Sequence, residues 1–252
     1  MDEILISHEA IGSNTLTNSQ AYTRPAPAEI PFLPGPVLLL GAPGVGKGTQ
    51  AQILMGRFGI PQISTGDILR SNIAKGTTLG KAAKELVGAG QLVSDDLVNQ
   101  MVADRLTAPD TTHGYVLDGF PRTLNQAVWV DDYLASADHT LPIVAIYICV
   151  GYDELLHRIT GRRTCPVCKS IYNIYSNPPK VENRCDLEGA DLVQRPDDTE
   201  PVFIERMKTF EAQTAPVVER YRAQGRFREI DGNQPVETVS AAIVTALQSL
   251  RA

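Results

Sequence analysis

A lysine inside a glycine-rich turn is the first feature of this sequence that points to chemistry. Gly41, Gly46 and Lys47 have the spacing of a phosphate-binding loop, in which the lysine can bridge two phosphates. The segment departs from the general pattern at one position, because Gly48 stands where serine or threonine is usual and Thr49 follows it. These residue types predict a site for the phosphates of a nucleoside triphosphate.

The residues on both sides of the turn predict the elements that hold it. An apolar run at 37–40 is typical of a buried strand in a parallel sheet, and a helical pattern covers 49–58. A strand, a glycine-rich turn and a helix N-terminus in this order direct backbone N–H groups and the helix dipole at an anion. A merely flexible turn is the alternative, and this context makes it the weaker interpretation.

A second chemical signal stands at the end of the apolar strand predicted at 114–118. Asp118 ends this strand, and a carboxylate there can hold Mg²⁺, directly or through water, beside the phosphates. On its own the signal is weak, because many strands end in aspartate for reasons of turn geometry. Arg122 follows within one turn and brings a guanidinium, which suits bidentate contacts to phosphate.

The remaining pattern predicts how these segments are positioned. Strands are predicted at 60–63, 141–150 and 227–230, and helices at 65–74, 80–87, 95–106, 153–160, 201–224 and 236–250. Strands that alternate with helices predict a doubly wound parallel sheet. Residues 161–198 lack a helical period and predict an inserted lobe of strands and turns. The polar, proline-rich residues 1–34 predict a poorly ordered extension.

Composition excludes several classes of protein. The chain has 252 residues, 43% of them hydrophobic and 21% charged, which is typical of a globular protein with one sizeable core. A formal net charge of −6 argues against a dedicated nucleic-acid binder. No apolar run approaches the roughly 20 residues of a membrane span, and the N-terminus lacks a secretory pattern, so we expect a cytoplasmic protein without membrane partners.

Four motifs together resemble the adenylate kinase family. They are the segments 41–50, 64–70, 117–123 and 195–198, which occur in the family's order and at its spacing. The resemblance covers about 36–250, and Gly48 is what this family shows at that position. It implies a P-loop NTPase-type parallel five-stranded sheet flanked by helices. It also implies the Mg²⁺-dependent reaction ATP + AMP ⇌ 2 ADP, and a monomer.

The resemblance also implies roles for individual residues. The expected ATP contacts are Gly44, Val45, Gly46, Lys47, Gly48, Thr49, Arg158, Arg162 and, through the backbone, Ile171, Tyr172 and Gln234. The expected AMP contacts are Thr65, Arg70, Gln91, Leu92, Val93, Gly119, Phe120, Pro121, Arg122, Gln126, Arg195 and Arg206. Catalysis is assigned to Lys47, Arg122, Arg162, Arg195 and Arg206.

The reaction that the resemblance implies explains why so many cationic residues would gather in one cleft. Phosphoryl transfer depends on positioning and charge stabilisation, and here two polyanions must meet. Each arginine taken singly is better interpreted as a solvated surface residue. Gln126 is expected to read the amino edge of adenine, with Thr65 nearby, because a polar site rejects a base that leaves its groups unpaired.

Cys165, Cys168 and Cys185 suggest a structural zinc site, which is a feature of one branch of this family. Tetrahedral zinc needs four ligands with paired spacing. The fourth is expected to be Glu188, where that branch carries cysteine or aspartate, and Asp186 is an alternative donor. A lobe held by hydrogen bonds, with relict cysteines, is the competing interpretation.

The resemblance divides the chain into a kinase core at 35–252 with two inserts. Residues 64–93 are expected to form a helical AMP-binding lobe, and 161–198 a β-rich lid that closes over ATP. Asp197 and Asp198 are expected to pair with arginines when the lid closes. An alternative interpretation is that they supply negative charge before the helix at 201.

Three other functions compete with adenylate kinase. The chain could be another nucleoside monophosphate kinase or one that uses GTP as donor. It could be a regulatory P-loop protein without turnover, although the set of arginines argues against that. A zinc-dependent nucleic-acid module built on the cysteines conflicts with the acidic charge balance.

Overall fold

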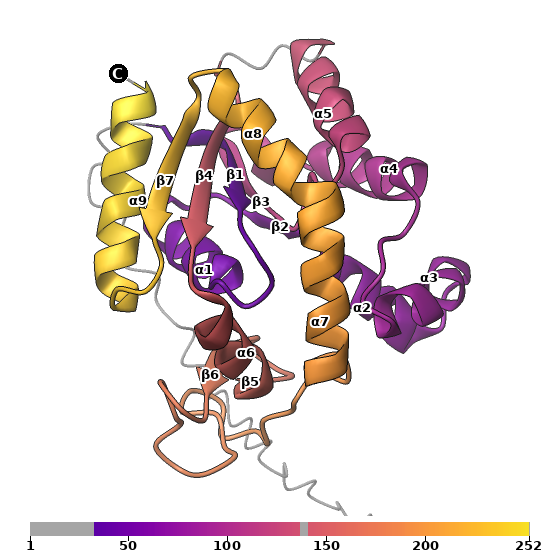
Figure 1. The fold of residues 1–252 in the computed structure, drawn as a ribbon, viewed down its shortest axis with the longest axis vertical. Coiled ribbons are helices and arrows are strands. Elements are labelled where there is room, and N and C mark those ends of the chain that lie inside the picture. The colour runs from indigo at the N-terminus through magenta and orange to yellow at the C-terminus, as the bar shows by residue number, and fades with distance from the viewer. Residues whose placement is uncertain (1–32, 137–140, 252) are drawn as a thin grey trace, which may run out of the picture.

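Five parallel strands form the central sheet of the computed structural model, which describes residues 33–136 and 141–251. Their order across the sheet is β2-β3-β1-β4-β7 (Figure 1). The strands are β1 (Gly35–Leu40), β2 (Gln62–Ser64), β3 (Gly114–Asp118), β4 (Val144–Cys149) and β7 (Phe227–Asp231). The expected parallel five-stranded sheet is therefore confirmed.

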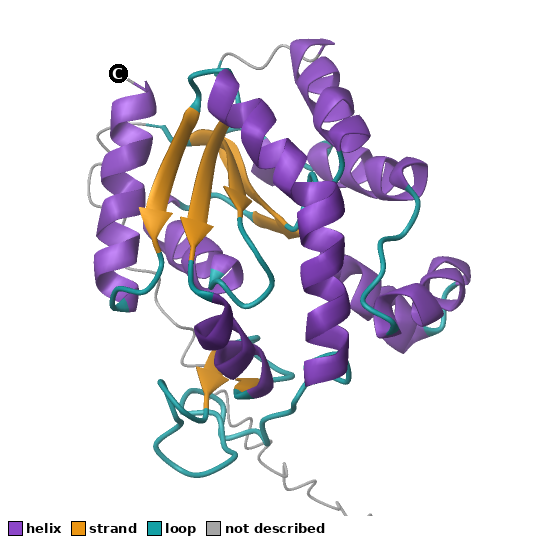
Figure 2. Ribbon diagram, viewed as in Figure 1, coloured by secondary structure: helices purple, strands orange, loops and turns teal. Residues whose placement is uncertain are grey.

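Helices cover both faces of this sheet (Figure 2). They are α1 (Lys47–Phe58), α2 (Thr65–Lys75), α3 (Thr78–Gly88), α4 (Asp95–Leu106), α5 (Leu124–Ser136), α6 (Tyr152–Thr160), α7 (Glu200–Thr209), α8 (Ala215–Ala223) and α9 (Val236–Arg251). A short 3₁₀ turn (Pro109–Thr111) precedes β3, and a π-helical turn (Phe210–Thr214) joins α7 to α8.

The two faces of β1 show why the layers form. Side chains alternate along a strand, so Val37 and Leu39 join the apolar cluster that contains residues of α1, α6 and α9. Leu38 and Leu40 join the opposite cluster, which contains residues of α4, α5 and α8. All six residues of β1 are buried, as the uninterrupted apolar run predicted.

The position of β1 determines where a ligand can bind. The chain places β3 on one side of β1 and β4 on the other, so the strand order reverses next to β1. Where the strand order reverses, a crevice forms at the carboxyl ends of the strands, and open α/β sheets bind their ligands in it. The loops that follow β1 and β3 both leave the sheet at this edge.

Two excursions from the sheet lie beyond the same edge (Figure 1). One is the pair α2 and α3, which pack so closely that a Cβ on Gly80 would lie 2.1 Å from the backbone oxygen of Asn72. The other is an antiparallel pair, β5 (Arg162–Thr164) and β6 (Ile171–Asn173), with short bridges around it. The expected strand-and-turn character of 161–198 agrees with this arrangement.

Two elements differ from the sequence-based prediction. The helix α5 was not predicted, although Ala127, Val130 and Leu134 are buried at helical spacing. The helix predicted at 201–224 contains a π-helical turn at Phe210–Thr214. Of the extension predicted at 1–34, residues 1–32 lie outside the described part of the chain.

Candidate functional site

The glycine-rich turn lies between β1 and the first turn of α1, as predicted. Gly46 precedes the helix with a φ of 103°. Gly44 has a φ of 87°, and a Cβ there would lie 2.9 Å from the backbone oxygen of Leu155, so a larger residue does not fit. Lys47 is the first residue of α1, and its Nζ donates to the backbone oxygens of Gly41 (2.8 Å) and Ala42 (2.9 Å).

The ammonium of Lys47 lies in a strongly cationic environment. The pKa of Lys47 is lowered to about 8, chiefly by burial and also by the charges of Arg122, Arg162 and Arg206, against the opposing effect of Asp118. Burial and neighbouring cations also lower the pKa of Arg122 and of Arg195 to about 10. A cleft in which cations repel one another is prepared to bind a polyanion.

Asp118 lies beside the glycine-rich turn at the end of β3. Its Oδ2 accepts a hydrogen bond from Nε2 of Gln62 at 2.9 Å. The same oxygen lies 3.6 Å from the place that a Cβ on Gly48 would occupy. A carboxylate oxygen this close to the first turn of α1 is a suitable donor for a hard cation such as Mg²⁺, directly or through water.

Two carboxylates just before α7 pair with arginines of the cleft. Arg162 donates to the fully buried Asp198, and Arg206 donates to Asp197. Burial raises the pKa of Asp197, but Arg206 and Arg70 outweigh this effect and hold it below its usual value. The expected pairing of these two aspartates with arginines is present.

Asp67 links the two excursions from the sheet. It lies in the first turn of α2, and its Oδ1 is 2.7 Å from a guanidinium nitrogen of Arg70. The same oxygen is 3.6 Å from a guanidinium nitrogen of Arg195, which belongs to the segment before α7. The segments 64–93 and 161–198 therefore approach each other across the cleft.

A cavity opens next to these arginines. Of the residues expected to contact AMP, all except Phe120, Pro121 and Arg195 line it. Phe120 instead points into the core, with its ring centroid 5.9 Å from that of Trp129. Three further apolar residues line the cavity, namely Leu69, Val87 and Val98. Sequence reasoning did not identify these three, because an apolar side chain that faces a cavity cannot be distinguished in the sequence from one that faces the core.

Thr65 and Gln126 are almost fully buried at this cavity. The hydroxyl of Thr65 donates to the backbone oxygen of Gly119 at 2.8 Å. Oε1 of Gln126 accepts from the backbone N–H of Arg122 at 2.8 Å. Both side chains are therefore fixed by the loop that follows β3.

The residues expected on the ATP side are more scattered. Arg158 donates to the backbone oxygens of Gly232 (3.0 Å) and Val45 (3.5 Å), so it adjoins the glycine-rich turn. The Cδ1 of Ile171 lies 3.4 Å from the Cβ position of Gly48. The exposed Gln234 donates to Asp231 at 3.1 Å. The side chain of Tyr172 is turned away, into the interior of the second excursion.

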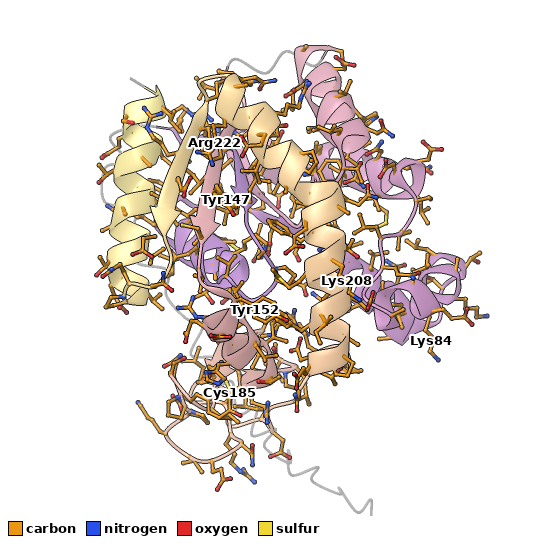
Figure 3. The ribbon with its side chains drawn as sticks, in the orientation of Figure 1. Lys84, Tyr147, Tyr152, Cys185, Lys208 and Arg222 are labelled. Atoms are coloured by element: carbon orange, nitrogen blue, oxygen red, sulfur yellow. The ribbon has the colours of Figure 1, made fainter. Side chains whose placement is uncertain are left out.

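Three cysteine sulfurs gather in that interior. The Sγ atoms of Cys165, Cys168 and Cys185 lie within 4.8 Å of one another (Cys185 is labelled in Figure 3). The Tyr172 hydroxyl, 3.5 Å from Sγ of Cys185, lowers the pKa of that thiol to about 6. Three thiols at this spacing fit a tetrahedral zinc ion.

The predicted fourth zinc ligand is not assembled with the thiols. Among the described residues, the cluster contains no carboxylate oxygen of Glu188 or Asp186. Oδ1 of Asp186 instead accepts from the backbone N–H of Lys180 at 2.8 Å. The structure therefore brings together three of the expected ligands and leaves the fourth undetermined.

Comparison with known proteins assigns the chain to a family. The model of a family described as adenylate kinase matches residues 39–226. An adenylate kinase of Nitrosococcus oceani is 47% identical over 215 residues, which cover 85% of this chain and 99% of the relative. One of Symbiobacterium thermophilum is 46% identical over 215 residues, with the same coverage of both chains. The chain belongs to the adenylate kinase family.

Adenylate kinases are nucleoside monophosphate kinases that use Mg²⁺ with ATP. The match extends from within β1 almost to β7, so it contains the glycine-rich turn, the cavity and the cysteine cluster. This membership removes the two non-kinase alternatives, the regulatory P-loop protein and the nucleic-acid module. Among the described residues, none of the helices is both long and apolar enough to cross a lipid bilayer.

Proposed function

We propose that this chain catalyses the reversible transfer of the γ-phosphoryl group of Mg–ATP to AMP, which yields two ADP and balances the adenine nucleotides. One observation carries most weight. The ammonium of Lys47 and the guanidinium groups of Arg122, Arg162 and Arg206 are close enough to lower the pKa of Lys47 together. Such a concentration of cationic side chains is suited to the phosphates of two substrates.

On the donor side, the backbone of Gly44, Val45, Gly46, Gly48 and Thr49 would surround the ATP phosphates. The N-terminus of α1 supports this role, since its free N–H groups and dipole favour an anion. Lys47 would leave the carbonyl oxygens that it now contacts and follow the transferring phosphoryl group. Arg158, Ile171, Tyr172 and Gln234 would contact the nucleoside, the last three through their backbone.

On the acceptor side, the cavity bordered by α2, α3 and α4 would bind AMP. Arg70, Arg122 and Arg206 line this cavity and would hold the monophosphate. Gln126 and Thr65, with the segment 91–93, would contact adenine. Gly119, Phe120 and Pro121 would contribute through the backbone, and Arg195 would reach the phosphate from the hinge of the lid.

Chemistry at this site would consist of positioning and charge stabilisation. Lys47, Arg122, Arg162, Arg195 and Arg206 would stabilise the oxygens of the transferred phosphoryl group. Asp118 would hold Mg²⁺, directly or through water, and the bound cation would supply further positive charge to the phosphates. We propose that the lobe 64–93 and the lid 161–198 move against the core at 35–252 to exclude water, which would otherwise hydrolyse ATP.

We further propose a zinc ion on Cys165, Cys168 and Cys185, with Glu188 or Asp186 as the fourth ligand after a side-chain movement. Its role would be to stabilise the lid rather than to take part in the reaction. We also propose that the chain is a cytoplasmic monomer. The reducing conditions of the cytoplasm keep thiols available for metal, which agrees with the zinc site. All four cysteines of the chain are free.

A direct assay tests the proposed reaction against other monophosphate kinases. The protein is incubated with Mg–ATP and, separately, AMP, CMP, UMP or GMP, and the diphosphates formed are quantified. We expect rapid turnover when AMP is the acceptor, and little turnover with CMP, UMP or GMP. Absence of turnover with AMP would refute the proposal, and a repeat with Mg–GTP would reveal a different donor. A compound that joins two adenosines through five phosphates should bind tightly to the folded protein and inhibit it.

A further inference from the structure

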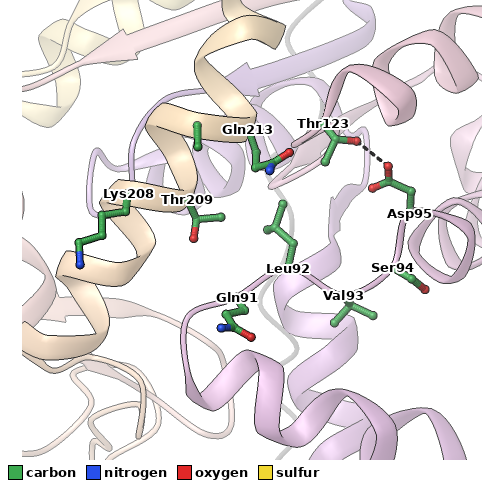
Figure 4. A pocket seen from close by; sticks show the side chains of 10 residues that line it. Gln91, Leu92, Val93, Ser94, Asp95, Thr123, Lys208, Thr209 and Gln213 are labelled. Atoms are coloured by element: carbon green, nitrogen blue, oxygen red, sulfur yellow. Dashed lines mark hydrogen bonds between the residues drawn. The ribbon is translucent and has the colours of Figure 1, made fainter.

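A chain of hydrogen bonds fixes the amide of Gln126 from both sides. Nε2 of Gln126 donates to Oδ1 of Asp95 at 2.8 Å, and Oε1 of Gln126 accepts from the backbone N–H of Arg122 at 2.8 Å. The other carboxylate oxygen of Asp95 accepts from the hydroxyl of Thr123 at 2.9 Å. Figure 4 shows Asp95 and Thr123 facing each other at the edge of a neighbouring cavity of about 460 Å³.

The two partners of the amide have opposite and fixed polarity. A carboxylate oxygen of Asp95 only accepts hydrogen bonds, and the peptide N–H of Arg122 only donates. A rotation of the Gln126 amide by 180° would set oxygen against oxygen at Asp95 and N–H against N–H at Arg122. Because Gln126 is only 2% exposed, water cannot readily satisfy these groups after such a rotation. The amide is therefore held in one orientation.

This orientation leaves one donor and one acceptor for a ligand. Nε2 keeps a second hydrogen atom and Oε1 keeps a second lone pair. Gln126 lines the cavity that we assign to AMP, so this step rests on the proposed function. A 6-aminopurine presents an N–H donor at position 6 and an acceptor at N1, whereas a 6-oxopurine presents an acceptor and an N–H donor at the same places.

We propose that Asp95 is the positioning residue that makes this site select 6-aminopurine over 6-oxopurine monophosphates. It does so by holding the Gln126 amide in the orientation that matches adenine. A 6-oxopurine in the same pose would need the rotated amide, which the carboxylate of Asp95 opposes. Asp95 itself need not touch the substrate.

The test compares AMP with inosine monophosphate, which differs from AMP only in the 6-oxo group and the proton on N1. The variant is Asp95→Asn, because an asparagine amide can either accept from or donate to Gln126, so that only the backbone N–H of Arg122 still opposes rotation of the Gln126 amide. We expect the ratio of kcat/KM for AMP to kcat/KM for inosine monophosphate to fall about 10-fold. Activity with inosine monophosphate should rise in absolute terms, which general damage to the enzyme would not produce.

Asp96→Asn is the matched control. Asp96 is the exposed neighbour in the same first turn of α4, so its replacement changes the charge near the helix N-terminus equally. The control should keep the wild-type ratio. If Asp95→Asn also keeps that ratio, or if Asp96→Asn changes it as much, the proposal is wrong.

A second variant covers the case in which Asp95→Asn fails to fold, which thermal unfolding would reveal. Thr123→Val removes the hydrogen bond that orients the Asp95 carboxylate, together with the bond that the hydroxyl accepts from the backbone N–H of Gln126, and leaves the carboxylate in place. We expect a smaller fall of the same ratio, and an unchanged ratio would contradict the proposal. Wild-type protein that does not phosphorylate AMP would instead overturn the proposed function, so the two failures are distinguishable.

Discussion

The hydroxyl of Thr214 donates a hydrogen bond to the backbone oxygen of Arg122 over 2.9 Å, although 92 positions separate the two residues. Thr214 is the last residue of the π-helical turn between α7 and α8. π-helical turns inside longer helices frequently occur at functional sites. This bond and the contact from Gln126 together fasten the backbone of Arg122 from two different helices.

Replacement of Thr214 tests whether this bond positions Arg122. Thr214→Val keeps the size of the side chain and removes the hydroxyl. A hydrogen bond of this kind contributes about 1 kcal/mol, so we expect kcat/KM for AMP to fall about 5-fold, with the KM for ATP unchanged. Thr214→Ser, which keeps the hydroxyl, should restore most of the activity. Equal losses in the two variants would show that packing, not the hydrogen bond, matters.

Loss of the Lys47 ammonium should abolish most activity without unfolding the protein. Lys47→Met keeps much of the side-chain volume. It removes a positive charge that burial and three nearby arginines destabilise, so the folded protein should not lose stability. We expect kcat to fall at least about 100-fold, by comparison with other groups that stabilise transition-state charge. Lys84→Met, at an exposed position of α3 (Figure 3), is the control and should be fully active. A Lys47→Met enzyme with near-normal kcat would refute the assigned role.

The affinity for ATP should depend on pH through Lys47. Its pKa is about 8 in the free protein, so above pH 8 most of the ammonium has lost its proton. A bound polyanion favours the charged form, and we therefore expect proton uptake on binding between about pH 8 and 9 and weaker binding as pH rises. Calorimetry in two buffers with different ionisation enthalpies measures this uptake. Lys47→Met should show none, and absence of uptake in the wild type would contradict the prediction.

The same pKa has a consequence for stability. The unfolded chain keeps the ordinary lysine pKa of 10.5, so between pH 8 and 10.5 it binds more protons than the folded protein does at this position. The contribution of Lys47 to the free energy of unfolding therefore rises with pH across this window. The free energy of unfolding of the wild type, minus that of Lys47→Met, should therefore rise between pH 8 and 10.5 when both are measured by denaturant unfolding.

Zinc analysis tests the cysteine cluster directly. Protein purified without chelators should contain about one zinc ion per chain, and Cys185→Ser should lose it. Loss of the metal should lower the melting temperature by about 5 °C. Cys149→Ser is the matched control, because Cys149 lies on β4, outside the cluster, and should retain the metal. Metal-free wild-type protein with an unchanged melting temperature after zinc addition would refute the site.

The close packing of α2 against α3 predicts an asymmetry between two glycines of the same helix. In Gly80→Ala the new Cβ would collide with the backbone oxygen of Asn72, so we expect a destabilisation of about 1–3 kcal/mol. In Gly88→Ala nothing lies within 4 Å of the new Cβ. Because alanine has the higher helix propensity, we expect the free energy of unfolding to stay the same or to rise by up to about 1 kcal/mol. Denaturant unfolding of both variants measures the difference. Equal stabilities would mean that the two helices separate easily.

Much of the site is predictable from local signals in the sequence. The strand–turn–helix around Lys47, the carboxylate at the end of β3 and the capped start of α2 each depend on neighbours within a few residues. Such segments keep their geometry because the backbone conformation and the first hydrogen bonds are local. The position of Asp118 beside the turn followed only after β1 and β3 paired in parallel.

Other features had no local signal. Tyr172 was expected to contact the nucleotide through its backbone, and that stays a prediction; its hydroxyl faces Cys185, because the alternation of β6 directs the side chain into the cysteine cluster. The carboxylates of Glu188 and Asp186 are not part of the cysteine cluster, so the choice of the fourth zinc ligand stays a prediction. Helix α5 is a different case, because Ala127, Val130 and Leu134 stand at helical spacing and the sequence alone was sufficient to predict it.

By itself, the sequence determined the chemistry of this protein: which residues carry charge, which turns can surround phosphate and which runs must be buried. Only the tertiary structure decided which distant groups meet, such as Asp95 with Gln126 and Thr214 with Arg122. The physical reason is that motif geometry depends on neighbouring residues in the chain, whereas the orientation of a buried amide depends on partners that only the packing of helices can supply.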